Sequence, residues 1–383
     1  MMEVIRVQTS KLMRFLWLAL VILSLAIDLP FAVKAKQLPL VINTWPVPSA
    51  TAEAWSQISR GSSAVEAVVK GCSKCEELQC RGSVGYGGKP DEHGETTLDA
   101  MIMNGATMEV GSVGDLRRIK NAIGVAHAVM MYSKHTLIVG ESAKEFAKGM
   151  GFVEEDLSTN KSFNDWRAWE RNNCQPNFRK NVVPDPTLHC GPYRPAENVS
   201  SSGNHDIMDT GPDNHDTIGM VVVDSKGNVA SGTSTNGLNH KIPGRVGDSP
   251  IVGAGSYASN AGGGAAATGN GDIMMRFLPS FHAVMEMEKG ASPREAATLA
   301  FSRMTKFYPD FSGAIIAANT KGEYGVACYG YESHTFCVQS PADSKVEMVT
   351  VLCLQKQGNS SDRGTVYTVL VIVSSLMSLV SLF

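Results

Sequence analysis

The stretch "PDNHDTIGMVVVDSKGNVA", from Pro212 to Ala230, contains the sharpest change of character in this 383-residue chain. The residues before it are mostly Ser, Asn, Asp, Gly and Pro, and an apolar run follows directly after Thr217. A short apolar run bounded by turn residues predicts a buried strand. A second run, "NVASGTST", follows the turn-forming "SKGN", so we predict a hairpin that begins at Thr217. The function of the protein has to explain why a threonine lies where the polar segment ends and the apolar run begins.

Other strands and helices are predicted on both sides of this hairpin. Strands are predicted at Leu38–Thr44, Thr96–Asn104, Met108–Val113, His135–Gly140, Gly313–Thr320 and Tyr324–Gly330. Helices are predicted at Ala50–Cys72, in two pieces, and at Leu116–Tyr132, Ser142–Met150, Asp272–Gly290 and Ser292–Tyr308. Ser63 and Glu66 have the spacing of a capping box. The segment from Asp156 to Asn214 is predicted to be loop, with residues 194–214 disordered.

The hairpin strands lack the polar alternation of a sheet that faces water on one side. Such strands are typical of sheets that are covered on both faces. We therefore expect an α+β fold with four layers, an αββα sandwich in which helices cover two stacked antiparallel sheets. With 43% hydrophobic residues the chain can bury a core of this size. The net charge of -3 and the absence of a basic run exclude nucleic acid as an expected partner.

Both ends of the chain contain apolar segments. The run Phe15–Ile27 follows basic residues, precedes small residues and is too short for an ordinary transmembrane helix. We predict a secretory signal peptide over residues 1–35 rather than an uncleaved anchor. The segment 359–383 is predicted to be a membrane anchor or a GPI signal, because its uncharged part is long enough to cross a bilayer. The expected location is the secretory pathway, in a lysosome or vacuole, with an extracellular or membrane-anchored protein as the alternatives.

Eight cysteines suit an oxidising compartment. Cys174 and Cys190 flank a loop without periodicity, which a disulfide would staple. Cys72, Cys75 and Cys80 include a Cys-x-x-Cys spacing that zinc also uses, but no second pair follows, so disulfides are favoured and no metal is expected. Three glycosylation sequons agree with secretion: Asn160-Lys161-Ser162, Asn198-Val199-Ser200 and Asn359-Ser360-Ser361.

Thr217 offers a route to nucleophilic catalysis. A hydroxyl nucleophile needs a base, and the chain has neither a GxSxG elbow nor a His clearly paired with a Ser. A threonine that is the first residue of a chain has its own α-amino group, with a pKa near ~8, beside its hydroxyl. This solution requires a cut between Asp216 and Thr217. The Thr217 hydroxyl would attack the Asp216 carbonyl, the acyl group would shift from nitrogen to oxygen, and water would hydrolyse the ester.

Several motifs extend this interpretation to a family. "NHDTIGMVVVD", "GTSTNG" (Gly232–Gly237), "GRVGDSP" (Gly244–Pro250) and "AATGNGD" (Ala266–Asp272) resemble the glycosylasparaginase, or aspartylglucosaminidase, family of N-terminal nucleophile hydrolases. "INTWPVPSATAEAW" and "GSVGYGG" are similar to its upstream half. The resemblance covers roughly residues 38–355 in the family's order. It implies the αββα fold, an autocleaved precursor and hydrolysis of the amide between N-acetylglucosamine and asparagine.

The resemblance also implies roles for matching residues. Thr217 matches the nucleophile, and Thr235 matches the residue whose hydroxyl touches the Thr217 amino group. Arg245 and Asp248 match the pair that binds the α-carboxylate and α-ammonium of the substrate's aspartyl part. Without the resemblance, Thr235 would be read as an ordinary strand residue, and the pair as an exposed ion pair in a turn.

The remaining matches concern the oxyanion and the pocket walls. Thr268 and Gly269 resemble an oxyanion hole, a hydroxyl and a backbone N–H aimed at the developing charge. Trp45 resembles a pocket-wall aromatic, with plain core as the alternative, and Ser83 is a further pocket candidate. Residues expected to line the same cleft are Val246, Gly247, Asn270 and Gly271.

One motif resembles a different kind of site, and one pair of positions departs from the family. "GAGSYA" (Gly253–Ala258) fits a dinucleotide fingerprint, but it lacks the strand before and the helix after that such a site needs. Ala297 and Ala317 stand where some relatives have a cysteine pair. The resemblance implies that Cys328 and Cys353 keep the C-terminal bridge, which leaves Cys72 and Cys337 without an assigned partner.

The expected protein is an N4-(beta-N-acetylglucosaminyl)-L-asparaginase without a cofactor. Its alpha chain would be residues 36–216 and its beta chain residues 217–358, assembled as a heterotetramer of two alpha and two beta chains. The alternatives are an L-asparaginase or isoaspartyl peptidase of the same superfamily, and an unprocessed, inactive, membrane-tethered binding protein.

Overall fold

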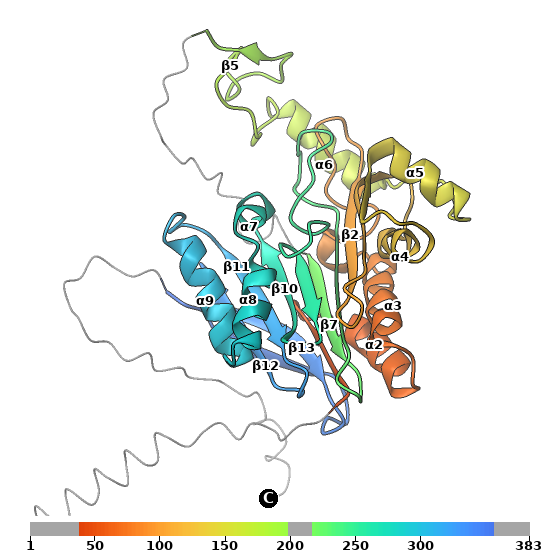
Figure 1. Cartoon of the computed structure of the whole chain (residues 1–383). Helices are drawn as coiled ribbons and strands as arrows, with labels where there is room; N and C mark the ends of the chain where they lie inside the picture. Colours follow the sequence, from red (N-terminus) through yellow and green to blue (C-terminus); the bar gives the residue numbers. More distant parts are fainter. Residues whose placement is uncertain (1–37, 198–216, 356–383) are drawn as a thin grey trace, which may run out of the picture. The chain divides into compact units, whose positions relative to one another are not determined.

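The computed structural model describes residues 38–197 and 217–355 (Figure 1). The predicted signal peptide, residues 198–214 of the segment predicted to be disordered, Asp216 and the apolar C-terminal segment lie outside the described residues. The start of that segment is described and forms a short strand at Arg194–Pro195, so the prediction of disorder is wrong there. In the two described ranges, no helix is both long enough and apolar enough to span a bilayer.

The larger sheet carries the hairpin that begins after Thr217. Its strands in spatial order are β14 (Glu347–Leu352), β13 (Ser333–Gln339), β1 (Leu40–Asn43), β7 (Ile218–Val223), β8 (Val229–Thr235), β2 (Thr97–Asn104), β3 (Val110–Arg117) and β4 (Leu137–Val139). Only the β3–β4 pair within this sheet is parallel, so the expectation of antiparallel sheets is wrong at one edge. The predicted β7–β8 hairpin is confirmed and lies in the middle of the sheet.

A second sheet stacks on the first. Its strands in order are β12 (Tyr324–Tyr329), β11 (Gly313–Ala318), β10 (Gly263–Gly269) and β9 (Ser256–Ser259). Strands β9 and β10 were not predicted, because their Gly- and Ala-rich sequence lacks the β-branched residues that indicate a strand. A separate two-stranded ribbon joins β5 (Val182–Val183) and β6 (Arg194–Pro195).

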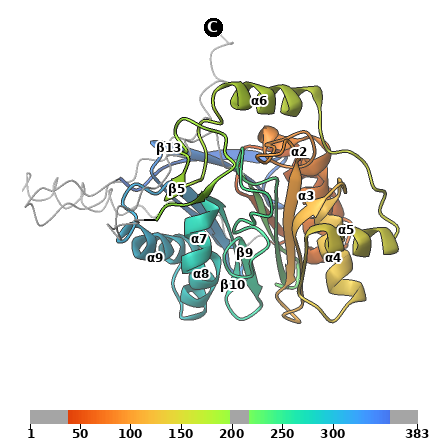
Figure 2. The same cartoon turned by 90° about the horizontal axis from the view of Figure 1, so that it is seen from above.

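Helices cover the outer face of each sheet, and Figure 2 shows the two groups on opposite sides. The larger sheet is covered by α2 (Pro48–Ser59), α3 (Ala64–Glu77), α4 (Ala122–Tyr132) and α5 (Gly140–Gly149). The smaller sheet packs against α8 (Pro279–Glu288) and α9 (Pro293–Thr305). The α+β fold with four αββα layers is therefore confirmed. Ser63 and Glu66 form the predicted capping box at the start of α3.

Small residues let the two sheets approach each other closely beside Thr217. A Cβ atom on Gly264 of β10 would lie 2.7 Å from a methyl of Val221 on β7. A Cβ atom on Gly219 would lie 2.8 Å from the Cβ of Ala266. These distances are shorter than carbon–carbon contact, so only glycine fits without moving the strands.

Helices α6 (Asn160–Arg171), α4 and the pair α7 (Gly271–Phe277) and α8 differ most from the predictions. Helix α6 lies in the segment predicted to be loop. Its largely polar sequence hides the helix, which is stabilised by a capping box at Thr159 and by buried Trp169. The predicted helix Leu116–Tyr132 starts only at Ala122, after the Asn121 cap, because β3 continues to Arg117. The predicted helix Asp272–Gly290 is divided into α7 and α8, because Pro279 starts a new helix.

Two disulfides are present, Cys174–Cys190 and Cys328–Cys353, and both expected pairings are confirmed. Cys72, Cys75, Cys80 and Cys337 are buried thiols, so the disulfides favoured for Cys72, Cys75 and Cys80 are not formed. Within the described ranges, no group of three or more His, Cys, Asp or Glu side chains is arranged to hold a metal ion.

Candidate active site

Thr217 immediately precedes the central strand β7 and is only 5% exposed. Its backbone nitrogen donates to Oγ1 of Thr268 (3.2 Å), at the end of β10 in the other sheet. Its carbonyl oxygen accepts from Oγ1 of Thr44 (2.8 Å), next to β1. Its own Oγ1 lies 3.4 Å from the hydroxyl oxygen of Ser249. Residues from three parts of the chain therefore hold the backbone and the hydroxyl of Thr217.

Thr268 and Gly269 lie where β10 ends. The Thr268 hydroxyl also accepts from Nε1 of Trp45 (3.0 Å), so one hydroxyl contacts both the indole and the Thr217 nitrogen. Gly269 has a φ of 145°, and a Cβ atom there would lie 2.6 Å from the Ser312 carbonyl oxygen. This conformation and this close approach both require glycine.

Thr235 ends β8, the strand beside β7. Its hydroxyl donates to the Ser83 carbonyl oxygen (3.3 Å) and accepts from the Gly237 nitrogen (3.0 Å). The Ser83 carbonyl also accepts from the Asn236 nitrogen (2.8 Å). Ser83 therefore acts here through its backbone, and it supports the end of β8.

A pocket of about 220 Å³, including the space at its mouth, brings most of the predicted residues together. It is lined by Thr217, Thr235, Gly237, Leu238, Arg245, Gly247, Asp248, Gly269 and Gly271. Trp45, Ser83 and Thr268 do not line it, and neither do Val246 and Asn270. Val246 packs against Gly114 of β3, and Asn270 caps α7 through its carbonyl oxygen.

The guanidinium of Arg245 lies against the backbone of Gly237 and Gly247, which line this pocket. A Cβ atom on Gly247 would be 2.8 Å from its Nη1, and one on Gly237 would be 3.1 Å away. Its Nε and Nη2 donate to the two carboxylate oxygens of Asp272 (3.3 and 2.8 Å). Asp272 therefore holds one edge of the guanidinium and orients the cation toward the pocket.

Asp248 is a buried carboxyl group in the pocket wall, only 4% exposed. Burial raises its pKa to about 7, although nearby Arg245 acts in the opposite direction. Its Oδ2 has no hydrogen-bond partner among the described residues. A Cβ atom on Gly271 would be 2.5 Å from Oδ1, so the backbone at residue 271 lies against the carboxyl group. The pocket thus contains a cation beside a carboxyl group with an open acceptor.

A smaller pocket of about 160 Å³ lies on another side of Thr217. Its lining comprises Trp45, Val47, Cys75, Cys80, Arg81, Val84, Thr217 and Ile218. The Arg81 guanidinium lies 4.4 Å from the centre of the Trp45 ring, a cation–π contact. The two pockets meet at Thr217.

Several residues of the site were not predicted, among them Thr44, Ser249 and Asp272. Thr44 is adjacent to Trp45, Ser249 follows Asp248, and Asp272 follows the "TGNG" motif. Their closeness in the sequence to predicted site residues was the one feature that could have indicated them. Their contacts join residues distant in the sequence, which local patterns do not reveal.

The raised pKa of Asp248 makes the charge of this carboxyl group dependent on pH near neutrality. An ammonium group needs the ionised carboxylate, and below about pH 7 the empty pocket holds increasing amounts of the neutral acid. We expect the inhibition constant of L-aspartate to rise about tenfold for each pH unit below 7. Inhibition measured from pH 5 to 8 checks this. Asp248→Asn should bind weakly throughout and lose the pH-dependent part; an unchanged slope in this variant would contradict the assignment.

Glu76 of α3 is a second buried carboxyl group, placed behind β8. Its Oε1 accepts from the Ile123 nitrogen (2.9 Å) and the Ser234 hydroxyl (2.5 Å). Burial raises its pKa to about 8, and Oε2 has no partner among the described residues. The folded protein therefore holds the neutral acid at neutral pH.

We expect Glu76→Gln to reduce the loss of stability at alkaline pH. The folded pKa lies above the ordinary value of 4.5, so the stabilisation is complete below about pH 4.5 and is lost as pH rises to 8. The neutral amide keeps the oxygen acceptor and should recover on the order of 2 kcal/mol at pH 8. Thermal unfolding of both proteins at pH 5 and pH 8 measures this difference. A decrease in Tm with pH that is equal in both proteins would exclude Glu76 as its source.

The four-layer αββα sandwich is the fold of the N-terminal nucleophile hydrolases, and the family match places the chain in this class. The chain belongs to the asparaginase family, whose model matches residues 18–348. A rat protein named N(4)-(Beta-N-acetylglucosaminyl)-L-asparaginase is 54% identical over 312 residues, 81% of this chain and 90% of the rat protein. A mouse protein of the same name is 50% identical over 340 residues, 87% of this chain and 98% of the mouse protein.

A plant protein is similar to nearly the same degree. The Arabidopsis thaliana protein named "Probable isoaspartyl peptidase/L-asparaginase 3" is 49% identical over 334 residues, 84% of this chain and 92% of that protein. The rodent and plant names all describe hydrolysis of an amide on an aspartyl group. The chain is an amidohydrolase, and the choice between amide substrates depends on the site.

Proposed function

We propose that this chain hydrolyses the amide bond between N-acetylglucosamine and the asparagine side chain, with Thr217 as the nucleophile. The observation that carries the proposal is the position of Thr217 between two pockets, one of which holds Arg245 and the open acceptor of Asp248. A guanidinium suits an α-carboxylate, and a carboxylate suits an α-ammonium. The amide carbon would then lie near the Thr217 hydroxyl, with the amino-sugar on the side of Trp45 and Arg81.

The chemistry begins with attack of the Thr217 Oγ1 on the amide carbon. The α-amino group of Thr217, free after the cut, accepts the hydroxyl proton. The hydroxyl of Thr268 and the backbone N–H of Gly269 donate to the oxyanion. The C–N bond breaks, the amino-sugar leaves with the proton from the α-ammonium, and an ester of Thr217 remains. Water hydrolyses this ester and releases aspartate.

The proposed cut between Asp216 and Thr217 would produce an alpha chain of residues 36–216 and a beta chain of residues 217–358. Strand β7 pairs with β1, and β8 pairs with β2, so strands from both sides of the cut alternate in one sheet. Their shared hydrogen bonds would keep the two chains together. Two such pairs would form the heterotetramer, in a lysosome or vacuole, and membrane association would depend on the segment 359–383.

The test compares the purified protein on three substrates: glycosylated asparagine, asparagine and a β-aspartyl dipeptide. Hydrolysis of glycosylated asparagine with the highest kcat/KM supports the proposal. A preference for the dipeptide would instead support the second candidate, an isoaspartyl peptidase, which the plant relative favours. A single uncut band on a gel, with no hydrolysis of any substrate, would support an inactive binding protein. Mass spectrometry of the mature termini locates the cut.

We expect the substrate to need both free α groups. Acetylation of the α-amino group of glycosylated asparagine removes the ammonium that Asp248 would bind, and loss of one charge-assisted contact should lower kcat/KM at least about tenfold. Asparagine inside an intact glycoprotein lacks both groups and should also be a poor substrate. Initial rates on the free and acetylated compounds measure the effect. Equal rates would remove Asp248 from the binding site.

A further inference from the structure

Lys241 is a lysine whose whole side chain is buried behind the pocket wall. It is 2% exposed, and its Nζ donates to the Asn236 carbonyl oxygen (2.7 Å). A Cβ atom on Gly237, which lines the pocket, would be 3.6 Å from this Nζ. The ammonium therefore holds the segment that joins Thr235 to Gly237 through the Asn236 carbonyl group.

Asp99 of β2 is bound to the other segment of the pocket wall. Its Oδ2 accepts from the Gly247 nitrogen (3.1 Å), between Arg245 and Asp248 in the sequence. Its Oδ1 accepts from the Asp115 nitrogen (2.8 Å). An irregularity in the β2–β3 pairing between Leu98 and Ala100 makes room for this contact. With only 3% of its surface exposed, Asp99 is a buried carboxylate whose two oxygens hold two backbone N–H groups.

Lys241 and Asp99 interact through their opposite charges. Burial lowers the pKa of Lys241 to about 8; the charge of Asp99 opposes this most strongly, followed by Asp91 and Asp115, whereas Arg245 repels the ammonium. A buried ammonium and buried carboxylates each need compensation from the other. Loss of Asp99 would remove the largest of the charges that compensate Lys241.

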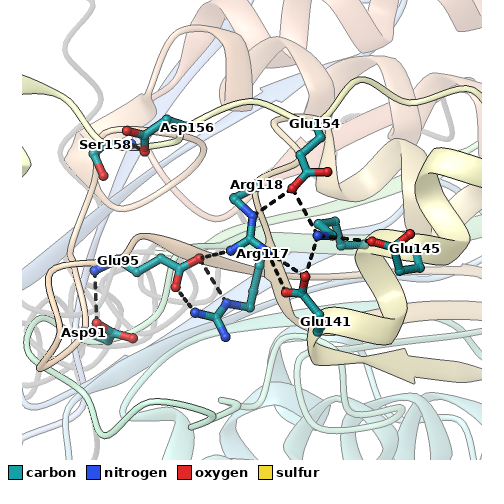
Figure 3. Close-up of polar contacts among 10 residues, drawn as sticks. Asp91, Glu95, Arg117, Arg118, Glu141, Glu145, Glu154, Asp156 and Ser158 are labelled. Atoms are coloured by element: carbon teal, nitrogen blue, oxygen red, sulfur yellow. Dashed lines mark hydrogen bonds and ion pairs between the residues drawn. The ribbon is translucent and has the colours of Figure 1, made fainter.

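The surrounding loops fix the carboxylates around Lys241. Asp91 pairs with Lys241 through a backbone bridge, and its Oδ1 accepts from the Glu95 nitrogen (3.0 Å). Figure 3 shows that the Glu95 carboxylate accepts from both Arg117 and Arg118. The Arg118 guanidinium also donates to Glu141 and Glu154. Arg117 and Arg118 form ion pairs with Glu95 at the end of β3. The charges behind the pocket therefore have fixed positions.

We propose that Lys241 and Asp99 are positioning residues that hold Arg245 and Asp248 at the spacing required by the α-carboxylate and α-ammonium of the substrate. Lys241 acts through Asn236 and Gly237, and Asp99 acts through Gly247; neither touches substrate. The inference rests on the proposed function for the aspartyl part of the substrate alone. The contacts of Thr217 with Thr44 and Thr268 do not involve this pair.

The predicted effect is therefore on binding rather than on the chemical step. Asp99→Asn is nearly isosteric and leaves one oxygen acceptor for two N–H groups, so either Gly247 or Asp115 loses its partner. We expect KM for glycosylated asparagine and the inhibition constant of L-aspartate to rise about tenfold, with kcat within about twofold and cutting before Thr217 retained. Lys241→Met should act in the same direction, and the double variant should recover part of the loss because neither charge remains uncompensated.

Lys144→Met is the matched control. Lys144 is also buried, at 5% exposed, but its ammonium binds Glu145 and Glu154 (3.1 and 3.0 Å) and no pocket residue. Its replacement should lower Tm without changing KM. This separates a general effect of removing a buried lysine from an effect on the pocket.

Unchanged KM and aspartate inhibition in processed Asp99→Asn would overturn the proposal, and so would a loss confined to kcat. If Lys241→Met does not fold, Asp99→Asn alone decides. L-aspartate carries the α-carboxylate and the α-ammonium but no leaving group. Its inhibition constant therefore tests Lys241 and Asp99 whatever amine the substrate releases. If the wild-type protein prefers a β-aspartyl dipeptide, the proposed substrate is wrong, but the inhibition constants still test the positioning pair.

Discussion

The Thr217→Ala variant is expected to remain one uncut chain and to lose at least about 10⁴-fold in kcat/KM. The reason is that one hydroxyl serves both reactions: it attacks the Asp216 carbonyl during maturation and the substrate amide afterwards. The variant should fold, because the lost oxygen has only the 3.4 Å contact with Ser249 among the described residues. A denaturing gel measures the cut, and hydrolysis of glycosylated asparagine measures the activity.

Thr217→Ser is the control for this prediction. It keeps the hydroxyl and removes the methyl that restricts the side-chain rotamer, so it should cut and hydrolyse at reduced rates. Normal cutting in Thr217→Ala would exclude the Thr217 hydroxyl from maturation. Normal hydrolysis in that variant would exclude it as the catalytic nucleophile.

Replacing Arg245 with Ala is expected to lower kcat/KM by about 30- to 150-fold, or ~2–3 kcal/mol, through loss of a charge-assisted contact with the substrate carboxylate. Asp272, which pairs with Arg245, is partly exposed, so water can solvate it in the variant. Cutting before Thr217 should be less affected, because the scissile peptide has no free α-carboxylate. Both reactions are measured in one Arg245→Ala preparation.

The Arg245→Lys variant tests geometry against charge. Lysine keeps the positive charge but loses the planar fork that binds a carboxylate with two N–H groups, so it should recover only part of the deficit. It also loses one of the two donors that reach Asp272. Unchanged kcat/KM in processed Arg245→Ala would place the substrate carboxylate elsewhere.

Much of the fold could be predicted from local patterns. The apolar runs of β7 and β8, the capping box at Ser63 and the turn between the hairpin strands depend on neighbours within a few residues, which the sequence displays directly. The break in composition at Thr217 similarly pointed to a special residue. Helix α6 and strand β10 were missed because a polar helix and an Ala-rich strand form by packing on distant elements, which overrides weak local propensity.

For the candidate site too, local sequence indicates some features and tertiary contacts decide the others. Thr217 lies at a break in composition that by itself suggests a special residue, whereas the roles expected of Arg245 and Asp248 came from the resemblance of their motifs to the family. The electrostatic environment of Asp248 and the partners of Asp99 and Lys241 emerged only in three dimensions. Burial and hydrogen bonding between segments more than a hundred residues apart, such as Asp99 and Gly247, depend on how the strands stack. Residue type decides what a group can do, but its pKa and its partners depend on the whole fold.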